Sequence, residues 1–201
     1  MNAAPFAAQA KADWRHALRL INPAFRIREE RPSDVAAREV LLDASFGPGR
    51  FAKTCERLRE GRLAATGLSF VATDGAEIVG SVRLWDVEIG HCASLMLGPL
   101  AVSQAKRSAG IGGALMEHAL RRAAKLGHES VFLVGDAPYY ARWGFDAALT
   151  NGFVLPGPVD RDRLLALELV PGALRGVSGR IVGAGAFAAS RRDEDGARLV
   201  A

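Results

Sequence analysis

The sequence predicts a single α/β (α+β) domain, built on a mixed, mostly antiparallel sheet of six or seven strands with flanking helices. Three observations lead to this fold class. Period-two patterns mark a strong hairpin over residues 68–85, a helical apolar stripe covers 111–126, and a buried apolar strand follows it at 130–134. The chain of 201 residues is long enough for one well-packed core.

Turn and capping residues set the boundaries of the expected elements. Pro32-Ser33-Asp34 is typical of a helix start, and Asp74-Gly75 is typical of a hairpin turn. Gly98-Pro99 interrupts a strand, and because proline has no N–H to donate, we expect a bulge or splay there. The expected strands are 25–29, 68–73, 77–85, 93–102, 130–134, a short one within 149–155, and 163–170, and the expected helices are 35–44, 50–60 and 111–126.

The folded domain is expected to span residues 25–175. Residues 1–24 are rich in alanine and are expected to form a short helix or a disordered extension. A transit peptide is disfavoured, because this stretch contains no serine. Small residues followed by a charged run predict a flexible tail over 176–201.

Composition excludes several classes of protein. The chain is 49% hydrophobic and 24% charged, as soluble domains are, and no apolar run is long enough to span a bilayer. Cys55 and Cys92 stand far apart without a CxxC pattern, so we expect free thiols and a cytoplasmic location. Four scattered histidines indicate no metal site. The net charge of +4 fits an anionic cofactor or a solvated surface better than nucleic acid, because no basic run with interleaved aromatic residues is present.

The segment 100–115 carries the most informative pattern. An apolar strand ends at Val102, a polar turn follows, and Arg107-Ser108-Ala109-Gly110-Ile111-Gly112 leads into a helix. Glycines let backbone approach a ligand closely, and the first helical turn offers unpaired N–H groups at the positive end of the helix dipole. The pattern therefore predicts a phosphate site, and here a pyrophosphate site.

Three phosphate-binding motifs compete for this segment. A P-loop is excluded, because no Gly-x4-Gly-Lys-Ser/Thr run is present. A dinucleotide fingerprint needs a small residue where Leu115 stands, although Glu129 lies at a suitable spacing for a ribose contact. The third motif, Arg-x-x-Gly-x-Gly after an apolar strand, resembles motif A of the GNAT superfamily of acetyl-CoA-dependent N-acetyltransferases.

A second segment strengthens this resemblance. Residues 131–145 read Val-Phe-Leu-Val-Gly-Asp-Ala-Pro-Tyr-Tyr-Ala-Arg-Trp-Gly-Phe and are similar to motif B of the same superfamily, a buried strand followed by a short helix. Both motifs stand in the expected order, and the resemblance covers residues 25–174. It is strongest to a bacterial subgroup with a Gly-Asp-x-x-Tyr-Tyr segment. In that family the strand before the phosphate turn bends away from its parallel neighbour and opens a V-shaped slot for pantetheine.

The resemblance implies an acetyl-CoA site along this slot. Two groups of backbone atoms would hold the cosubstrate, a strand end for pantetheine and a glycine-rich turn for pyrophosphate. They belong to Leu100, Ala101 and Val102 on the strand, and to Ser108, Ala109, Gly110, Ile111, Gly112 and Gly113 on the turn. Arg107 would either reach a phosphate or orient the turn.

Tyr140 stands four residues before Gly144, where the family places its general acid. Such an acid would protonate the departing CoA thiolate. The ordinary pKa of tyrosine, about 10, exceeds that of a thiol, about 8.5, so a helix N-terminus or a cation would have to lower it. Packing as an amphipathic wall residue is the alternative role for Tyr140.

No general base is assigned. Many relatives carry a glutamate on the bent strand, but residues 94–100 contain no acid here. Glu168, Asp136 and a water chain stay open as routes for the amine proton. By analogy of fold alone, we expect the acceptor side of the slot to be lined by the Phe46–Arg50 loop, Arg83 and Trp85.

The expected function is transfer of an acetyl group from acetyl-CoA to a primary amine, by direct attack in a ternary complex and without a metal. A homodimer is allowed by the sequence. Two other functions stay open. One is a non-catalytic acyl-CoA-binding regulatory module, and the other is a GNAT toxin acting on charged tRNA, which salt-dependent RNA retention would reveal.

Overall fold

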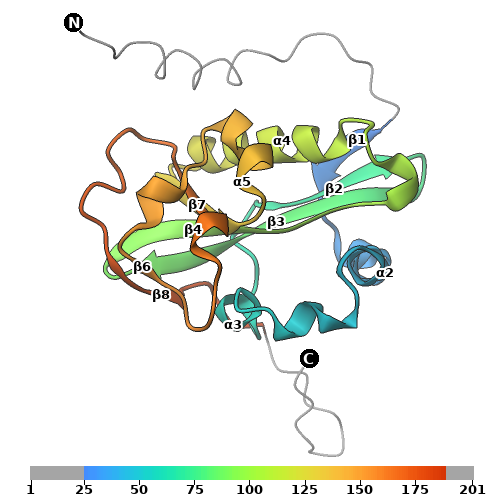
Figure 1. Cartoon of the computed structure of the whole chain (residues 1–201). Coiled ribbons are helices and arrows are strands. Elements are labelled where there is room, and N and C mark those ends of the chain that lie inside the picture. The colour runs from blue at the N-terminus through green and yellow to red at the C-terminus, as the bar shows by residue number, and fades with distance from the viewer. Residues whose placement is uncertain (1–24, 189–201) are drawn as a thin grey trace, which may run out of the picture.

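The computed structural model describes residues 25–188, in which a mixed sheet of eight strands carries helices on both faces (Figure 1). The main path of the sheet runs β1 (Arg26–Glu29), β2 (Ser69–Asp74), β3 (Glu77–Ile89), β4 (Cys92–Val102), β5 (Ser130–Val134) and β7 (Leu164–Glu168). Off this path, β8 (Gly179–Gly183) pairs with β3 and with β6 (Phe153–Val154). Of the pairings, β4–β5 and β6–β8 are parallel and the others are antiparallel, which confirms the expected sheet type.

The helices form two outer layers. The helices α4 (Ile111–Lys125) and α5 (Ala137–Tyr140) lie over one face of the sheet, and α2 (Val35–Phe46) and α3 (Glu56–Arg59) lie over the other (Figure 1). Short 3-10 turns connect these elements: η2 (Pro32–Asp34), η3 (Pro48–Ala52), η4 (Gln104–Lys106), η5 (Ala141–Trp143), η6 (Ala147–Thr150) and η7 (Arg161–Arg163).

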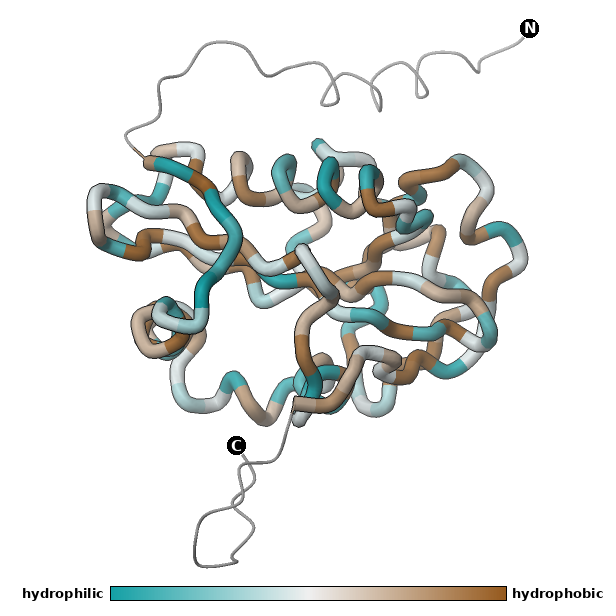
Figure 2. The backbone as a smooth tube through the Cα atoms, turned by 180° about the vertical axis from the view of Figure 1, so that it is seen from behind, coloured by the Kyte–Doolittle hydropathy of each residue, from teal (hydrophilic) through white to brown (hydrophobic). Residues whose placement is uncertain are grey.

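Each face of the sheet has its own apolar core. Successive side chains of a strand point to opposite faces, so Leu95 and Leu97 of β4 join the core under α4, whereas Met96 joins the core on the other side. Leu115 of α4 is completely buried against the first core. Figure 2 shows apolar colour concentrated along the strands of the middle layer.

A bulge bends β4 midway along its length. Leu97 pairs with Leu84 and Leu100 pairs with Val82, so Gly98 and Pro99 together oppose the single residue Arg83. The Trp85 indole N–H donates to the Gly98 carbonyl at 2.5 Å, which satisfies a group that the ladder leaves free. Beyond the bulge β4 stays with β3 and leaves β5, to which it pairs only through Leu95 and Met96. The splay of the central strands is therefore confirmed.

Two expectations about elements were wrong. The helical pattern over 50–60 is broken, because the backbone of Lys53 is extended between η3 and α3 and the Thr54 hydroxyl donates to the Pro158 carbonyl at 2.6 Å. The flexible tail expected over 176–201 is wrong for Gly179–Gly183, because these residues form β8, which belongs to the sheet and brings the strand count to eight. The expectations for residues 1–24 and 189–201 lie outside the described residues. Nowhere between residues 25 and 188 does a helix have the length and apolar character needed to cross a bilayer.

Candidate active site

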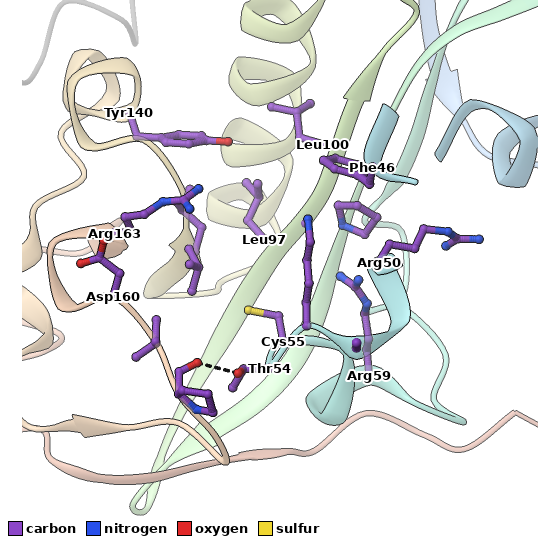
Figure 3. Close-up of a pocket in the computed structure, with 18 residues that line it drawn as sticks. Phe46, Arg50, Thr54, Cys55, Arg59, Leu97, Leu100, Tyr140, Asp160 and Arg163 are labelled. Atoms are coloured by element: carbon purple, nitrogen blue, oxygen red, sulfur yellow. Dashed lines mark hydrogen bonds between the residues drawn. The ribbon is translucent and has the colours of Figure 1, made fainter. Parts of the chain in front are cut away.

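Two cavities meet where β4 separates from β5. The larger has a volume of about 450 Å³ and the smaller about 240 Å³. Phe46, Leu100 and Tyr140 line both. Figure 3 shows Tyr140 with its hydroxyl directed across the larger cavity toward Leu100. A ligand that occupied both cavities would therefore pass beside the Tyr140 hydroxyl.

The smaller cavity lies at the N-terminus of α4. Half of the residues predicted to hold the cosubstrate line it: Leu100, Ala101, Val102, Arg107 and Gly112. The others lie beside it without lining it: Ser108, Ala109 and Gly110 are exposed on the turn, Ile111 is buried in the core, and Gly113 lies near Trp143. For these the prediction concerned backbone N–H groups, and it stays a prediction.

The turn before α4 has the backbone geometry of an anion site. Ser108 and Gly110 adopt left-handed conformations, with φ of 66° and 78°. The first backbone hydrogen bond of the helix runs from the Ala114 N–H to the Gly110 carbonyl at 3.0 Å, so the preceding helical amides have no intrahelical acceptor. The Lys106 ammonium lies 2.7 Å from an Asp74 carboxylate oxygen and ties the turn to the β2–β3 hairpin.

Gly112 keeps this corner open. A Cβ atom at Gly112 would lie 3.1 Å from the Tyr139 hydroxyl oxygen and 3.5 Å from a Val102 methyl carbon. The residues present therefore fit a phosphate group, since they combine free amides, the positive end of a helix dipole and a space that a side chain would fill.

Burial governs the electrostatics of Tyr140. It raises the pKa of the phenol to about 12, Tyr139 adds to the effect, and the opposing charge of Arg163 is outweighed. The requirement drawn from the sequence, a lowered pKa, is therefore not met. The hydroxyl stays protonated at any physiological pH and can serve as a donor.

The larger cavity lies between the α2–α3 segment, the second half of β4, the end of β5 and the segment before β7. Figure 3 shows Arg50, Cys55 and Arg59 on one wall and Arg163 and Asp160 on the other. Burial raises the pKa of the Cys55 thiol, so this group stays neutral at pH 7. The lining residues are Phe46, Arg50, Ala52, Lys53, Thr54, Cys55, Arg59, Leu97, Gly98, Pro99, Leu100, Leu133, Val134, Tyr140, Pro158, Val159, Asp160 and Arg163.

Of the residues expected by analogy on the acceptor side, two line the larger cavity and two do not. Phe46 and Arg50 line the larger cavity. Arg83 is instead paired with Glu30, and Trp85 is buried beside the β4 bulge. Neither of these two lines either cavity.

The two carboxylates considered as bases also lie elsewhere. The Glu168 carboxylate accepts the N–H groups of Gly172 and Leu174, both at 2.9 Å, and so closes a turn. Asp136 precedes α5 and lines neither cavity. Asp160 is the one carboxylate among the described lining residues, and no local sequence pattern distinguished it. Within residues 25–188, no group of three or more His, Cys, Asp or Glu side chains is arranged to hold a metal ion.

Comparison with protein families agrees with this geometry. A model of the acetyltransferase (GNAT) domain matches residues 65–147. The uncharacterised N-acetyltransferase YhbS of Escherichia coli strain K12 is 30% identical over 158 residues, which cover 77% of this chain and 93% of YhbS. YjhQ of the same strain, also an uncharacterised N-acetyltransferase, is 28% identical over 135 residues, covering 65% of this chain and 75% of YjhQ.

Solved structures show the same fold. The crystal structure of Escherichia coli YhbS in complex with CoA superimposes with a TM-score of 0.69 at 30% identity, covering 83% of this chain and 94% of that one. A GNAT family acetyltransferase from Brucella melitensis in complex with acetyl-CoA gives a TM-score of 0.57 at 26% identity, covering 82% and 96%.

Proposed function

The chain belongs to the GNAT superfamily of N-acetyltransferases, and on that premise we propose that it transfers the acetyl group of acetyl-CoA to a small primary amine by direct attack. The observation that carries the proposal is the meeting of two cavities at Tyr140. The smaller cavity has the features of a phosphate site, and the larger has room for an acceptor. Both substrates would then reach one point, as a ternary complex requires.

Acetyl-CoA would lie along the bent half of β4. The relatives from Escherichia coli and Brucella melitensis were solved with CoA and with acetyl-CoA. In this chain the free amides at the start of α4 and the space over Gly112 would hold the pyrophosphate, with Arg107 beside it. The backbone of Leu100, Ala101 and Val102 would face the pantetheine arm. When bound, the cosubstrate supplies an activated acetyl thioester.

The amine attacks the thioester carbonyl without an enzyme nucleophile. Cys55 is the one cysteine among the lining residues, and burial keeps its thiol protonated, so an acetyl-cysteine intermediate is disfavoured. The amine must be neutral to attack, and with a pKa of about 10.4 only about one molecule in two thousand is neutral at pH 7. We therefore expect the rate to rise with pH until the amine is deprotonated.

Tyr140 stabilises the sulfur as the carbon–sulfur bond breaks. Complete proton transfer from a phenol of pKa about 12 to a thiolate of pKa about 8.5 is uphill by about 5 kcal/mol. A hydrogen bond from the protonated hydroxyl to the developing thiolate has no such cost and acts only when charge appears. In the proposed mechanism Tyr140 is a donor to the departing sulfur. The attacking amine nitrogen loses one proton to water as the amide forms, and a proton from water neutralises the thiolate.

The test of the cosubstrate site is Gly112→Arg. The backbone at Gly112 is helical, so an arginine can adopt its conformation. Its Cβ would displace the Tyr139 hydroxyl slightly, and the rest of its side chain would fill the space beside Val102. We expect the affinity for acetyl-CoA, measured by calorimetry, to fall by about 100-fold or more, because several bonds to a charged group are lost together. The far-UV circular dichroism should be unchanged.

The matched control is Ala124→Arg. Ala124 is exposed near the other end of α4, so this variant adds the same side chain to the same helix away from the cavity. It should bind acetyl-CoA as the wild type does. Equal affinities for all three proteins would overturn the proposed site.

A further inference from the structure

The larger cavity is lined by more positive than negative side chains. Four cationic residues and one carboxylate line it within the described part of the chain, namely Arg50, Lys53, Arg59, Arg163 and Asp160. Which of these charges a ligand would meet depends on the partners that each already has.

Two of the cations are neutralised by the protein itself. Arg50 donates to the carboxylates of Glu39 and Asp43, the latter at 2.7 Å from Nε. The Arg59 guanidinium lies 2.5 Å from a Glu56 carboxylate oxygen. Because carboxylates hold both side chains, these arginines contribute shape and hydrogen-bonding capacity rather than net charge.

The remaining two cations have no such carboxylate. Among the described residues, neither Lys53 nor Arg163 has an acidic group within 4 Å of its charged atoms. The Lys53 ammonium lies 4.9 Å from the centre of the Phe46 ring, and the Arg163 Nε donates to the Gly135 carbonyl at 3.4 Å. Figure 3 shows the Arg163 guanidinium directed into the cavity, on the side of Tyr140. Its remaining N–H groups are available to a ligand.

The single carboxylate is itself engaged. The Asp160 side chain accepts the N–H of Asp162 at 3.1 Å and so caps η7. One carboxylate therefore faces two cations that have no acidic partner, Lys53 on the wall formed by the α2–α3 segment and Arg163 on the opposite wall, and the cavity between them carries excess positive charge. A cationic polyamine would be repelled by this cavity, and an anionic group would be attracted to it.

We propose that the acceptor is a small primary amine that also carries an anionic group, a carboxylate or a phosphate, which Lys53 and Arg163 bind. This proposal rests on the proposed acetyl transfer. A volume of about 450 Å³ suits a small molecule. The anionic group would be held between the two cations, and the amine would then extend toward Tyr140, where the two cavities meet.

The experiment measures thiol release from acetyl-CoA with pairs of amines that differ in the anionic group. Serine is compared with serinol (2-amino-1,3-propanediol), phosphoethanolamine with ethanolamine, and glucosamine 6-phosphate with glucosamine, because the two amines of each pair have similar basicity. The anionic member of at least one pair should have a kcat/KM about tenfold or more above its neutral partner, as one bond to a charged group provides. The carboxylate and phosphate pairs distinguish the two sources of anionic charge.

Variants then test whether Lys53 and Arg163 cause the preference for anionic acceptors. Lys53→Gln should raise KM for the anionic acceptor about tenfold and leave KM for its neutral partner unchanged. Lys53→Arg and Arg163→Lys keep the charge and should keep the preference. Lys125→Gln removes the same charge from an exposed position at the end of α4, and should change neither KM.

The outcomes separate this proposal from the one on which it rests. If acetyl-CoA binds and neutral or cationic amines are acetylated as fast as their anionic partners, the anionic acceptor is wrong and the acetyltransferase function stands. If Lys53→Gln affects both members of a pair equally, the role of Lys53 is overturned. If acetyl-CoA does not bind, or no amine releases thiol, both proposals fall.

Discussion

At the scale of single residues, the position of Tyr140 depends on a glycine five residues earlier. A Cβ atom at Gly135 would lie 2.8 Å from the Tyr140 Cδ2 atom and closer still to Cε2. Non-bonded carbons normally approach no closer than about 3.5 Å, so only glycine lets the Tyr140 ring lie against the backbone. This contact explains the spacing in the Gly-Asp-x-x-Tyr-Tyr segment, because the ring of the second tyrosine packs on the backbone of the glycine that follows β5.

Gly135→Ala should therefore reduce catalysis without touching either substrate. Tyr140→Phe is expected to lower kcat by about 100-fold through loss of its hydroxyl. Gly135→Ala should lower kcat in the same direction by displacing the ring, with the KM for acetyl-CoA nearly unchanged. Steady-state kinetics of both single variants measures this.

A double-variant cycle supplies the control. Once Tyr140 is replaced by alanine, the new methyl group has no ring to displace and its nearest contact is the end of the Leu133 side chain, at 3.0 Å, so Gly135→Ala should have little further effect on kcat. Gly49→Ala, whose added carbon would meet nothing within 4 Å, should leave kcat unchanged. Additive losses in the double variant would contradict a positioning role for Gly135.

At the scale of elements, ion pairs hold α2 to the sheet. The Arg28 guanidinium of β1 donates two hydrogen bonds to Asp34, at 2.6 and 2.9 Å, and the Arg31 N–H donates to the same carboxylate at 2.7 Å. Between these two arginines in the sequence, the buried Glu30 carboxylate pairs with Arg83 of β3 and with Arg38 of α2. Since Phe46 ends α2 and lines both cavities, these contacts help to set the cavity wall.

The Arg28–Asp34 pair makes stability depend on pH in a defined direction. The hydrogen bonds from Arg28 lower the pKa of Asp34 to about 2, so the native state favours the ionised form. The stabilisation is complete above the pKa of the unfolded chain, about 3.9, and is lost as the pH falls toward 2. Asp34→Asn should lower the free energy of unfolding by about 1–2 kcal/mol at pH 7, since the pair is partly exposed.

Urea unfolding at several pH values measures this effect. The deficit of Asp34→Asn relative to the wild type should be constant from pH 8 to 5 and shrink below about pH 4. Arg28→Gln removes the partner instead of the acid and should show the same dependence. A deficit that persists unchanged at pH 3 would mean that packing, rather than charge, accounts for the contribution of Asp34.

At the scale of the whole molecule, local signals predicted one part of the fold and distant contacts determined the rest. Alternation marked the β2–β3 hairpin, Gly98-Pro99 marked the bulge, and the apolar stripe marked α4. Each of these signals lies within the element that it describes. Five residues of the smaller cavity, from Leu100 to Gly112, were predicted for the same reason, because a strand end, a turn and a helix start are consecutive in the chain. The remaining lining residues come from α2 and α5, which lie far away in the sequence.

The larger cavity could not be read from the sequence, because segments a hundred residues apart form it. Thr54 bonds to the Pro158 carbonyl at 2.6 Å and Arg57 bonds to the Pro156 carbonyl at 2.7 Å, and these contacts bring Lys53 and Arg163 to one cavity. The sequence around either cation resembles an ordinary solvated surface.

The sequence does not predict the last strand of the sheet, because small residues such as those of β8 are also typical of flexible chain. Gly183 in fact passes so close to the Leu58 carbonyl that no side chain fits there. The strand β8 pairs with Val87, Glu88 and Ile89, and so completes the half of β3 that β2 does not cover. Glycine content here therefore reflects close packing of backbone.

Ile181 and Val182 of β8 provide a test of this packing within two adjacent residues. Ile181 is fully buried in the core on the α3 side, whereas the next residue, Val182, is 41% exposed. Ile181→Ala should lower the free energy of unfolding by about 2–4 kcal/mol, because it removes buried carbons and leaves a cavity. Val182→Ala should change it by less than about 0.5 kcal/mol. Equal and small effects in urea unfolding would show that β8 contributes nothing to the core. The expected difference would show that β8 unfolds together with the rest of the domain.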